Sequence, residues 1–577
     1  MILQALKDYY DRKAADPESG IAPLGWERKE IPYLIVLSKQ GEFLRLEDTR
    51  EEGMARSFLV PSLGESKGSG IKSNFPWENA EYVFGFPIKS DKKNKVSERH
   101  KAFMERVREY SAYDWAKSIL SFLDDPKVEA IASRYKDAWA RILKGDYLLF
   151  SIEGVPVSDL DSFKTAYHVP QDGEKIVCLV TGKNDVLKEK EPAIKGSGLF
   201  KVSKTQQVKS ELHIVSFNQD AFRSFGKKQG ANATIGQTAS FAYTTALNSL
   251  LAFGSRQKMQ VGDATVVFWA ERGCLLETSF SDFFSEPKPD NPDGLCRNVK
   301  ALFDSPRTGV FRENEERARF YVLGIAPSSS RLVVRFWHVG TVAEMAGRFR
   351  VYFDDLLIAH GPEDRDHLSL WRLLVSTAVQ GKPENIAPNL AGNVMRSILE
   401  GLPFPETLLS AVLTRIKVEH EVSYPRAKLV KGCLNRKWRF NNPQNERKLT
   451  VSLDKENVNV GYRLGRLFAV LERIQEAAHS GINATIKDRF YASASSTPTS
   501  VFGNLMRLAS HHLSKLGKEK PGYAVNLEKL MQEVIAGIAR FPAHLSLDDQ
   551  GQFAIGYYHQ RQDFFAKKDA EEQPVNK

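Results

Sequence analysis

The sequence predicts an α+β protein, in which a mixed α/β N-terminal and central region is followed by an all-α C-terminal helical bundle. Three observations predict this class. Short apolar runs bounded by turn residues occur in the first part, a segment with apolar residues every three or four positions interrupts them, and such helical spacing fills nearly everything beyond residue 363. At 577 residues the chain is too long for a single core.

The N-terminal region should contain a short helix over the first dozen residues and then two strands, PYLIVL and FLRLEDT, around a turn at Gln40-Gly41. EYVFGF, which ends at residue 86, reads as another strand. Helical spacing runs from about 101 to 143, where Pro126 divides two helices.

The central region returns to strands, with DYLLFSIEG, EKIVCLVTG, TVVFWAE and RLVVRFWHVG, and one helix from about Gln237 to Ala252. A large polar insertion is expected at 277–330, and four or five amphipathic helices from about 460 to 565. The predicted domains are an N-terminal β-rich region, a mixed α/β region, a helical basic connector and a helical bundle, at 1–98, 99–362, 363–449 and 450–577.

Composition narrows the function. Lys plus Arg outnumber Asp plus Glu by 81 to 71, which gives a net charge of +10 and favours an anionic partner. The four cysteines have no CxxC spacing, so neither a zinc ribbon nor a disulfide framework is indicated. No apolar run approaches the roughly 20 residues that a membrane span needs, so we expect a cytoplasmic protein without a membrane partner.

The segment GESKGSGIKSNF, residues 64–75, resembles a phosphate loop but lacks its spacing. Five residues separate Gly64 from Gly70, and Ile71 stands before the Lys-Ser pair, so the sequence does not fit a nucleotide-hydrolysis loop. Contact with nucleic acid stays open, with the side chains of Lys72, Ser73 and Asn74 for phosphate or base edges and Phe75 as a wedge at a base step. The alternative is an exposed loop in which Phe75 only packs.

Two further segments combine positive charge with features of nucleic-acid binding. In the first, Lys227, Lys228, Gln229 and Asn232 lie near glycines before a helix N-terminus, where a phosphate backbone could bind. In the second, residues 426–440, the basic residues Arg436, Lys437 and Arg439 alternate with aromatic ones. A solvated loop and a solvated helix face are the respective alternatives.

Catalysis has little support in the sequence. No HExxH or HxH spacing occurs, and acidic pairs such as Asp354-Asp355 lack partners in a consistent nuclease pattern. We therefore expect no catalytic residues, no metal site and no cofactor, with a metal-dependent nuclease or nucleotide hydrolase and a purely structural scaffold as alternatives.

Several stretches together resemble one family. IAPLGWERKEIPYLIVL, SGIKSNFPWENAEYVFG, VSFNQDAFRSFGKKQGANATIGQTASFAYTTALNSLL, ATVVFWAE, RFWHVGTVAEM and FAIGYYHQRQDFF occur in the order found in the type I-C CRISPR-associated large subunit of Cascade, the Csd-type or "Cas-eight" family. The similarity spans nearly the whole chain.

The resemblance implies a non-catalytic subunit of an RNA-guided surveillance complex in antiviral defence. Such a subunit reads the PAM in target double-stranded DNA, holds the displaced strand of the R-loop, contacts the guide RNA and recruits a helicase–nuclease. Its other partners would be the backbone, 5′-handle-binding and small subunits of Cascade, and its C-terminal bundle would resemble the small subunit. By position, the PAM-reading residues are expected to be Gly70, Lys72, Ser73, Asn74 and Phe75, and the other two segments are expected to contact nucleic-acid backbones.

Overall fold

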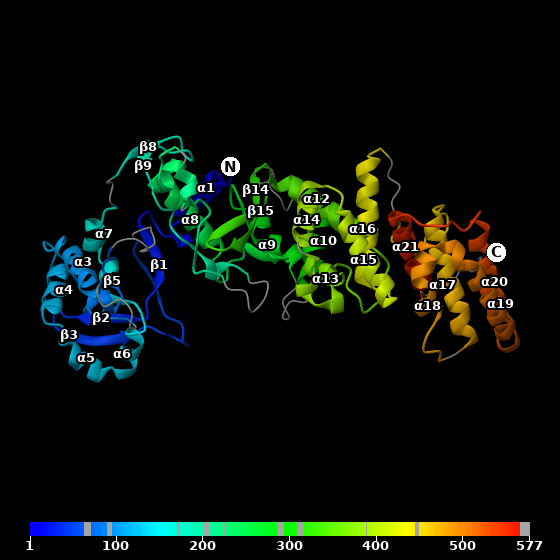
Figure 1. Cartoon of the computed structure of the whole chain (residues 1–577), viewed down its shortest axis with the longest axis horizontal. Coiled ribbons are helices and arrows are strands. Elements are labelled where there is room, and N and C mark those ends of the chain that lie inside the picture. The colour runs from blue at the N-terminus through cyan, green and yellow to red at the C-terminus, as the bar shows by residue number, and fades with distance from the viewer. Residues whose placement is uncertain are drawn as a thin grey trace, which may run out of the picture. The chain divides into compact units, whose positions relative to one another are not determined.

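The computed structural model divides the chain into two compact units. The first comprises Met1–Gly198, Lys209–Ala252 and Pro327–Leu332, and the second comprises Leu199–Val208, Phe253–Ala326 and Val333–Lys577. Figure 1 shows the elements in chain order. The structure describes residues 1–62, 71–88, 95–169, 173–200, 208–217, 219–223, 225–285, 293–308, 317–387, 389–444, 449–479 and 481–565.

The first unit is built around a mixed sheet. Its strands follow the order β3-β2-β6-β5, with β7 paired to β6 at the side. Strands β2 and β6 run parallel, with Tyr33 opposite Leu148, and the other pairs are antiparallel. The strand bounds are β2 Tyr33–Leu37, β3 Phe43–Asp48, β5 Trp77–Glu78, β6 Leu148–Ile152 and β7 Val155–Pro156.

Both faces of this sheet are covered, which explains why every residue of YLIVL in β2 is buried. Tyr33, Ile35 and Leu37 face a core made with the helices that connect β2 to β6. Leu34 and Val36 face a two-stranded ribbon, formed by β1 (Trp26–Glu30) and β4 (Ser57–Pro61). The connecting helices are α2 Ala80–Val83, α3 Val96–Arg108, α4 Asp114–Asp124, α5 Val128–Arg134 and α6 Lys136–Ile142.

Two sequence predictions in this region were wrong in detail. EYVFGF forms no strand, because the side chain of Asn79 accepts a hydrogen bond from the Glu81 amide and begins the short helix α2. The segment 101–143 forms four helices instead of two, because it turns at residues 109–113 and at Tyr135 as well as at Pro126.

The rest of the first unit includes one long helix, α8 (Gln237–Leu250), which packs against α1 (Ile2–Ala14). The other elements are short: α7 Asp161–Ala166, β8 Lys175–Val177, β9 Asn184–Val186, β10 Ile194–Lys195, β11 Glu211–Leu212, η5 Asp220–Arg223 and η6 Gln229–Asn232. The predicted strand in EKIVCLVTG is therefore only the three residues of β8.

The second unit begins with a four-stranded sheet, in the order β12-β13-β14-β15. One face of β13 packs on helices α9 and α12 through Phe268, Phe280 and Phe349. The polar insertion expected at 277–330 was wrong in part, since it contains α9, α10 and the buried strand β14. The bounds are β12 Lys258–Val261, β13 Ala264–Ala270, α9 Leu275–Phe284, α10 Gly294–Thr308, β14 Arg319–Ser328, β15 Arg331–Thr341 and α12 Val342–Leu356.

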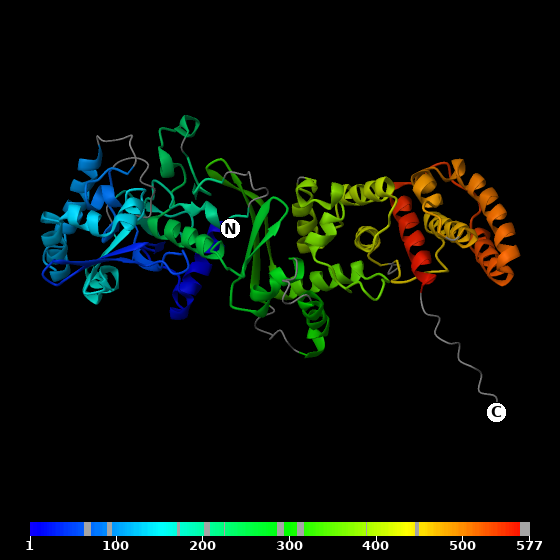
Figure 2. The same cartoon turned by 90° about the horizontal axis from the view of Figure 1, so that it is seen from below.

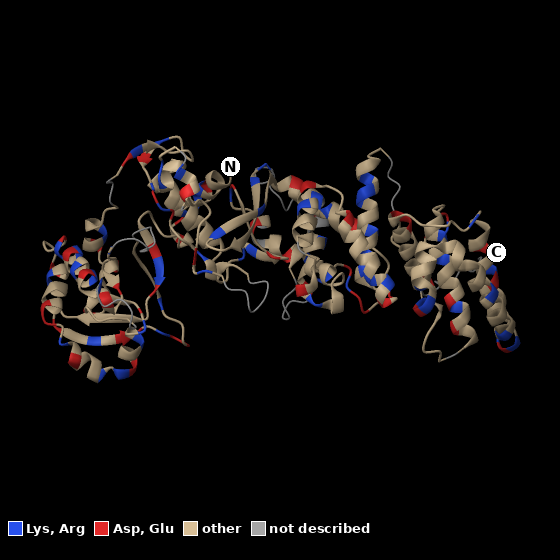
Figure 3. Ribbon diagram, viewed as in Figure 1, with Lys and Arg blue, Asp and Glu red and all other residues tan. Residues whose placement is uncertain are grey.

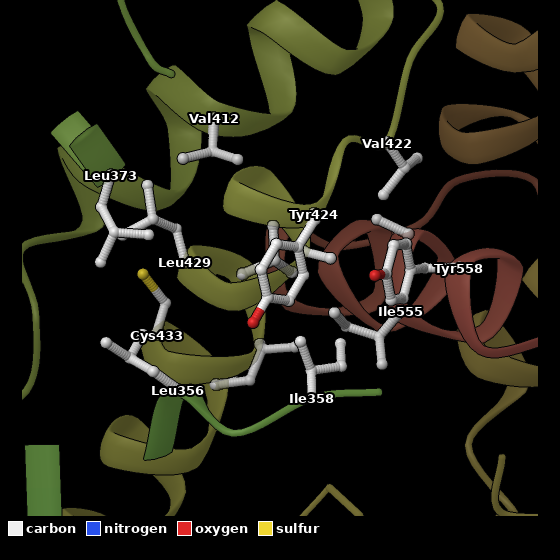
Figure 4. Close-up of a cluster of buried hydrophobic side chains, with 14 of the residues drawn as sticks. Leu356, Ile358, Leu373, Val412, Val422, Tyr424, Leu429, Cys433, Ile555 and Tyr558 are labelled. Atoms are coloured by element: carbon white, nitrogen blue, oxygen red, sulfur yellow. The ribbon is translucent and has the colours of Figure 1, made fainter. Parts of the chain in front are cut away.

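The remainder of the second unit is helical, as predicted. Helix α16 lies among its neighbours with nearly every residue from Tyr424 to Arg436 buried. Figure 4 shows the side chains of Leu356, Tyr424, Cys433 and Tyr558 converging in this core. The helices before the final bundle are α13 Leu370–Val375, α14 Leu390–Glu400, α15 Glu406–Glu419 and α16 Tyr424–Asn441.

Helices α17 to α21 form the predicted C-terminal bundle (Figure 1, Figure 2). Helices α17 and α21 cross so closely that a Cβ on Gly465 would lie 2.0 Å from the carbonyl oxygen of Phe553. The bounds are α17 Val460–Ala478, α18 Ile486–Ser496, α19 Phe502–Glu519, α20 Pro521–Ala536 and α21 Leu547–Asp563. The bundle also contacts earlier helices of its unit, for example where Lys417 donates to the Gln550 side chain at 2.6 Å.

Candidate nucleic-acid interface

The first predicted site, residues 70–75, is only partly exposed. Gly70 lies outside the described residues, together with the rest of 63–70. Lys72 is exposed, whereas Ser73, Asn74 and Phe75 are buried at 7%, 7% and 4% exposure. The structure therefore places one cationic side chain at the surface and the three residues after it in the protein interior.

Phe75 packs inside an aromatic cluster of the first unit. Its ring stacks on Tyr110 at a centroid distance of 5.5 Å and lies 5.7 Å from Trp115 and 6.0 Å from Phe163. These contacts favour the packing alternative, because a side chain that wedges into DNA would have to leave this cluster. In the observed conformation Phe75 is therefore not positioned to insert between bases.

Asn74 and Ser73 fix the turn that enters β5. The backbone amide and the side-chain amide of Asn74 both donate to Oε1 of Glu78, at 3.0 and 3.2 Å. Glu78 is fully buried, and its other oxygen accepts from the Asn79 amide at 3.1 Å. The Ser73 hydroxyl donates to the Asn74 carbonyl at 2.9 Å. A buried carboxylate needs such donors, so Asn74 has a structural partner whatever it reads in DNA.

The second predicted site is an outward-facing loop between η5 and η6. We call Arg223, Phe225, Lys227 and Lys228 the basic-aromatic loop. All four side chains are exposed, and Phe225 is 90% exposed, which is unusual for a large apolar residue. Arg223 forms an exposed ion pair with Asp220 at 3.0 Å, a kind of contact that contributes little to stability.

The neighbouring polar residues hold this loop in place. The Gly230 amide donates to the Glu189 carbonyl at 2.9 Å, and a Cβ at Gly230 would lie 2.1 Å from the Lys188 carbonyl oxygen. The side-chain amide of Asn232 donates to the Gln229 carbonyl at 3.1 Å. Gln229 and Asn232 are thus half-buried parts of the η6 turn, whereas the two lysines extend from it.

The expectation of a phosphate at the following helix N-terminus needs correction. Helix α8 already has an anion there, since the carboxylate of Asp185 accepts from the Thr238 amide at 3.0 Å. Helix N-termini favour negative charge, and here an internal carboxylate supplies it. Any phosphate that binds this region must therefore bind through the side chains of the loop.

The third predicted site, on α16, is mostly buried. The guanidinium of Arg436 is 3% exposed and donates to the carbonyls of Ser397 and Leu402, at 2.7 and 2.8 Å. It lies 3.6 Å from the carboxylate of Asp355, which is itself fully buried and also binds Arg439. Arg436 is consequently a structural residue in this conformation. It does not lie on a solvated helix face, and it is not exposed for contact with a nucleic-acid backbone.

The two neighbours of Arg436 are also paired. Lys437 contacts the carboxylates of Glu406 and Asp548 at 3.0 and 2.9 Å, and these partners raise its pKa. Hydrogen bonds to Asp355 raise the pKa of Arg439 in the same way. Figure 3 shows the Lys and Arg residues along α16, but the charge drawn there is largely neutralised by internal partners.

Burial in α16 also changes the basicity of a lysine. The Lys428 ammonium donates to the carbonyls of Leu356 and Asp366, at 3.2 and 2.7 Å, and lies 4.6 Å from the ring of Tyr424. Desolvation, reinforced by the positive charge of Lys431, lowers the pKa of Lys428 to about 7. Such a lysine lacks the permanent charge with which surface lysines bind phosphate.

Sequence reasoning missed Phe225. The signal that could have found it is an aromatic residue directly before Gly-Lys-Lys, in a segment too polar and glycine-rich to bury it. No group of three or more His, Cys, Asp or Glu residues is arranged to hold a metal ion in the described part of the chain. In this part of the chain, none of the helices has the length and apolar composition that crossing a membrane requires.

The family comparison agrees with the sequence resemblance. A family model described as CRISPR-associated protein (Cas_Csd1) matches residues 6–565, which is nearly the whole chain. A comparison with curated proteins found no match.

Proposed function

Because the chain belongs to the Csd1 family of CRISPR-associated proteins, we propose that it is the non-catalytic large subunit of a type I-C Cascade complex. In this role it binds target double-stranded DNA at the PAM, stabilises the displaced strand and recruits the helicase–nuclease. Its partners are the guide RNA and the other Cascade subunits, and it acts in the cytoplasm. The observation that carries the proposal is the basic-aromatic loop, whose cations and aromatic ring face solvent.

The exposed loop has the chemistry that non-specific nucleic-acid contact requires. Lys227 and Lys228 can neutralise phosphates, and the ring of Phe225 offers a face on which a base can stack. Neither lysine is needed to hold the fold, because both extend from the turn that Gly230 and Asn232 fix. We assign backbone and single-strand contacts to this loop.

PAM reading is assigned to the segment that ends at β5, with Lys72 as its exposed cation. To read a base edge, the Asn74 side chain must either use the hydrogen-bonding groups that Glu78 leaves free or give up its bond to Glu78. Gly70 and Ser73 stay in the proposal as parts of the same arm, and Phe75 as the residue that anchors this arm in the core.

The test is PAM discrimination by the assembled complex that contains each variant. Lys72→Ala should weaken binding to every duplex and reduce the salt slope by about one unit if Lys72 contacts a phosphate. Asn74→Ala should relax discrimination at one PAM position by about 1–3 kcal/mol if the side chain reads a base. Lys101→Ala, which removes an exposed lysine from α3, is the matched control.

Two results would overturn the proposal. If neither Lys72→Ala nor Asn74→Ala changes PAM binding, the assignment of PAM reading to this segment is wrong. Turnover of DNA, RNA or ATP by the purified chain with a divalent metal, abolished in Lys72→Ala or Asp354→Ala, would replace the non-catalytic subunit with an enzyme.

A further inference from the structure

Strand β15, which is labelled in Figure 1, stands at the end of the strand order β12-β13-β14-β15 and forms one edge of that sheet. With 11 residues it is about twice as long as a typical strand. Its sequence, RLVVRFWHVGT, contains no proline, no lysine and no acidic residue. Natural proteins usually protect an exposed edge by keeping it short, by charging it or by placing proline in it. The length and composition of β15 therefore indicate an edge that another strand covers.

Two other sheet edges show the usual protection. The opposite edge of the same sheet, β12, has only four residues. Strand β3, an edge of the sheet in the first unit, carries the exposed ion pair of Arg45 and Glu47 at 2.8 Å. On β15 beyond Leu332, Arg335 is the single charged residue, and its partner Asp263 lies in the turn between β12 and β13. Since β14 lies between that turn and β15, Arg335 reaches back across its own sheet and leaves the edge unguarded.

The backbone of β15 presents unpaired groups at this edge. The Ser330 carbonyl accepts from the His213 amide at 3.2 Å, and the Leu332 amide donates to the His213 carbonyl at 2.9 Å, so these two residues face outward. In an antiparallel ladder the amide and carbonyl of one residue point to the same edge, and successive residues alternate. The next outward residues are Val334, Phe336 and His338. In the described part of the chain, their backbones form no hydrogen bond outside the β14 ladder.

The side chains make this edge apolar and hold it rigid. Three valines of β15 are more than a third exposed: Val333, Val334 and Val339. The ring of Phe336 covers Gly324 of β14, where a Cβ would lie 2.4 Å from it. Trp337 stacks on Tyr321 of β14, with ring centroids 5.7 Å apart and an interplanar angle of 12°. Because β15 is already fixed in its extended form, a strand that adds to it has little ordering cost to overcome on this side.

The sequence of β15 is complementary to itself in one antiparallel register. When a two-fold axis passes through Phe336, every outward residue faces an outward residue of the other copy. The facing pairs are then Val333 with Val339, Val334 with His338, Arg335 with Trp337 and Phe336 with Phe336. Apolar and aromatic pairs stabilise facing strands, and Arg beside Trp allows a cation–π contact. An axis through Arg335 would instead place two arginines opposite each other, which disfavours that register.

We propose that β15 pairs antiparallel with β15 of a second copy of this chain, so that the two four-stranded sheets join into one. The paired segment, 333–339, ends just before Leu332, whose edge His213 already occupies. Strand pairing of this length buries less surface than a typical permanent interface, so the dimer should depend on protein concentration. This self-association is separate from the nucleic-acid contacts of the proposed function.

The first test measures the molar mass of the full chain by sedimentation equilibrium over a hundredfold dilution. Wild type should shift from monomer towards dimer as its concentration rises. Val334→Pro removes an amide that lies outside the β14 ladder, so the chain should still fold. It should dimerise about 5- to 150-fold more weakly, because two symmetry-related backbone hydrogen bonds are lost. Val334→Thr, which keeps the amide and the branched side chain, is the matched control and should still dimerise.

Val339→Lys tests the side-chain pairing with every backbone group intact. It places a lysine opposite Val333 in both halves of the interface and should weaken dimerisation by about 2- to 30-fold. Val351→Lys, which changes a similarly exposed valine on α12, is the control and should leave dimerisation unchanged. Thermal unfolding shows which variants fold.

A crosslinking experiment tests the register. Val333→Cys chains mixed with Val339→Cys chains should form a disulfide-linked dimer under air oxidation, because these two positions face each other across the interface. Either variant alone should give no more crosslinked dimer than wild type with its four native cysteines.

Three results would overturn the inference. The first is a folded wild-type chain that stays monomeric at every concentration. The second is a dimer that neither Val334→Pro nor Val339→Lys weakens, since its interface would then lie elsewhere. The third is a monomeric chain whose outward β15 amides become protected from hydrogen exchange only in the assembled complex, which would show that a strand of another subunit covers the edge.

Discussion

Two lysine- and arginine-rich segments of this protein resemble each other in sequence and differ completely in the structure. In the basic-aromatic loop, the side chains of Lys227, Lys228 and Phe225 extend into solvent. In α16, Arg436 is 3% exposed and is held by two carbonyls and a carboxylate. Positive charge near an aromatic residue therefore indicates nucleic-acid binding only where the local sequence cannot bury it.

The surroundings of each segment explain the difference. In α16 the basic residues share the helix with Ala427, Leu429, Val430, Cys433 and Leu434, which form an apolar face, and nearly every residue from Tyr424 to Arg436 is buried. Because neighbouring elements cover the polar sides of this helix as well as its apolar face, its buried cations need internal partners. The loop has glycines at 226 and 230 and no continuous apolar face, so its lysines stay outside.

The largest effect should come from removing the buried guanidinium. Arg436→Ala leaves the carboxylate of Asp355 with only Arg439 as a partner and removes the hydrogen bonds that the guanidinium donates to the Ser397 and Leu402 carbonyls, so unfolding free energy should fall by about 3–5 kcal/mol. Denaturant unfolding measures this. Lys228→Ala, the control from the exposed segment, should change stability by no more than about 0.5 kcal/mol. Equal losses of unfolding free energy in the two variants would contradict the contrast between the buried helix and the exposed loop.

The two phenylalanines of the candidate interface offer the same contrast. Phe75→Ala removes the centre of an aromatic cluster and should lower stability by about 3–5 kcal/mol. Phe225→Ala should leave the melting temperature unchanged and weaken single-strand binding by about 1–3 kcal/mol. If Phe225→Ala instead lowers stability as much as Phe75→Ala, the Phe225 side chain is packed in the folded protein, and its proposed role in base stacking is wrong.

A smaller effect concerns pH. Because the pKa of Lys428 is lowered from 10.5 to about 7 in the folded state, the unfolded chain binds a proton that the folded chain lacks between these values. Stability should therefore rise with pH from about 7 towards 10.5, by at most about 1.4 kcal/mol per pH unit for this residue. Comparing wild type with Lys428→Met in denaturant unfolding at pH 7, 8 and 9 isolates that slope. An unchanged slope in the variant would mean that Lys428 stays charged in the folded protein.

Much of the fold could be predicted because strong periodicity decided it. The turn at Gln40-Gly41, the helix at 237–252 and the bundle of α17 to α21 all follow from spacing that no tertiary contact overrides. EYVFGF was misread because its apolar residues suit a strand, whereas the Asn79 cap and burial on α3 make it helical. The sequence analysis did not predict β14, because the polar residues around this strand made the whole of 277–330 resemble a single polar insertion.

The candidate site was harder to predict for a different reason. Residue type suggested that Asn74, Phe75 and Arg436 could bind DNA, but tertiary partners decide whether a side chain is available. Those partners, Glu78, Tyr110 and Asp355, lie 4, 35 and 81 positions away in the chain, and only the first is near enough in sequence to suggest the contact.

The most direct measurement is the salt dependence of nucleic-acid binding by the Lys227→Ala/Lys228→Ala double variant in the assembled complex. If the loop binds phosphates, the slope of log affinity against log salt should fall by about two units, one for each lysine, while the melting temperature stays at the wild-type value. An unchanged slope in a folded double variant would contradict the account, since the exposed cations of the loop would then contact no phosphate.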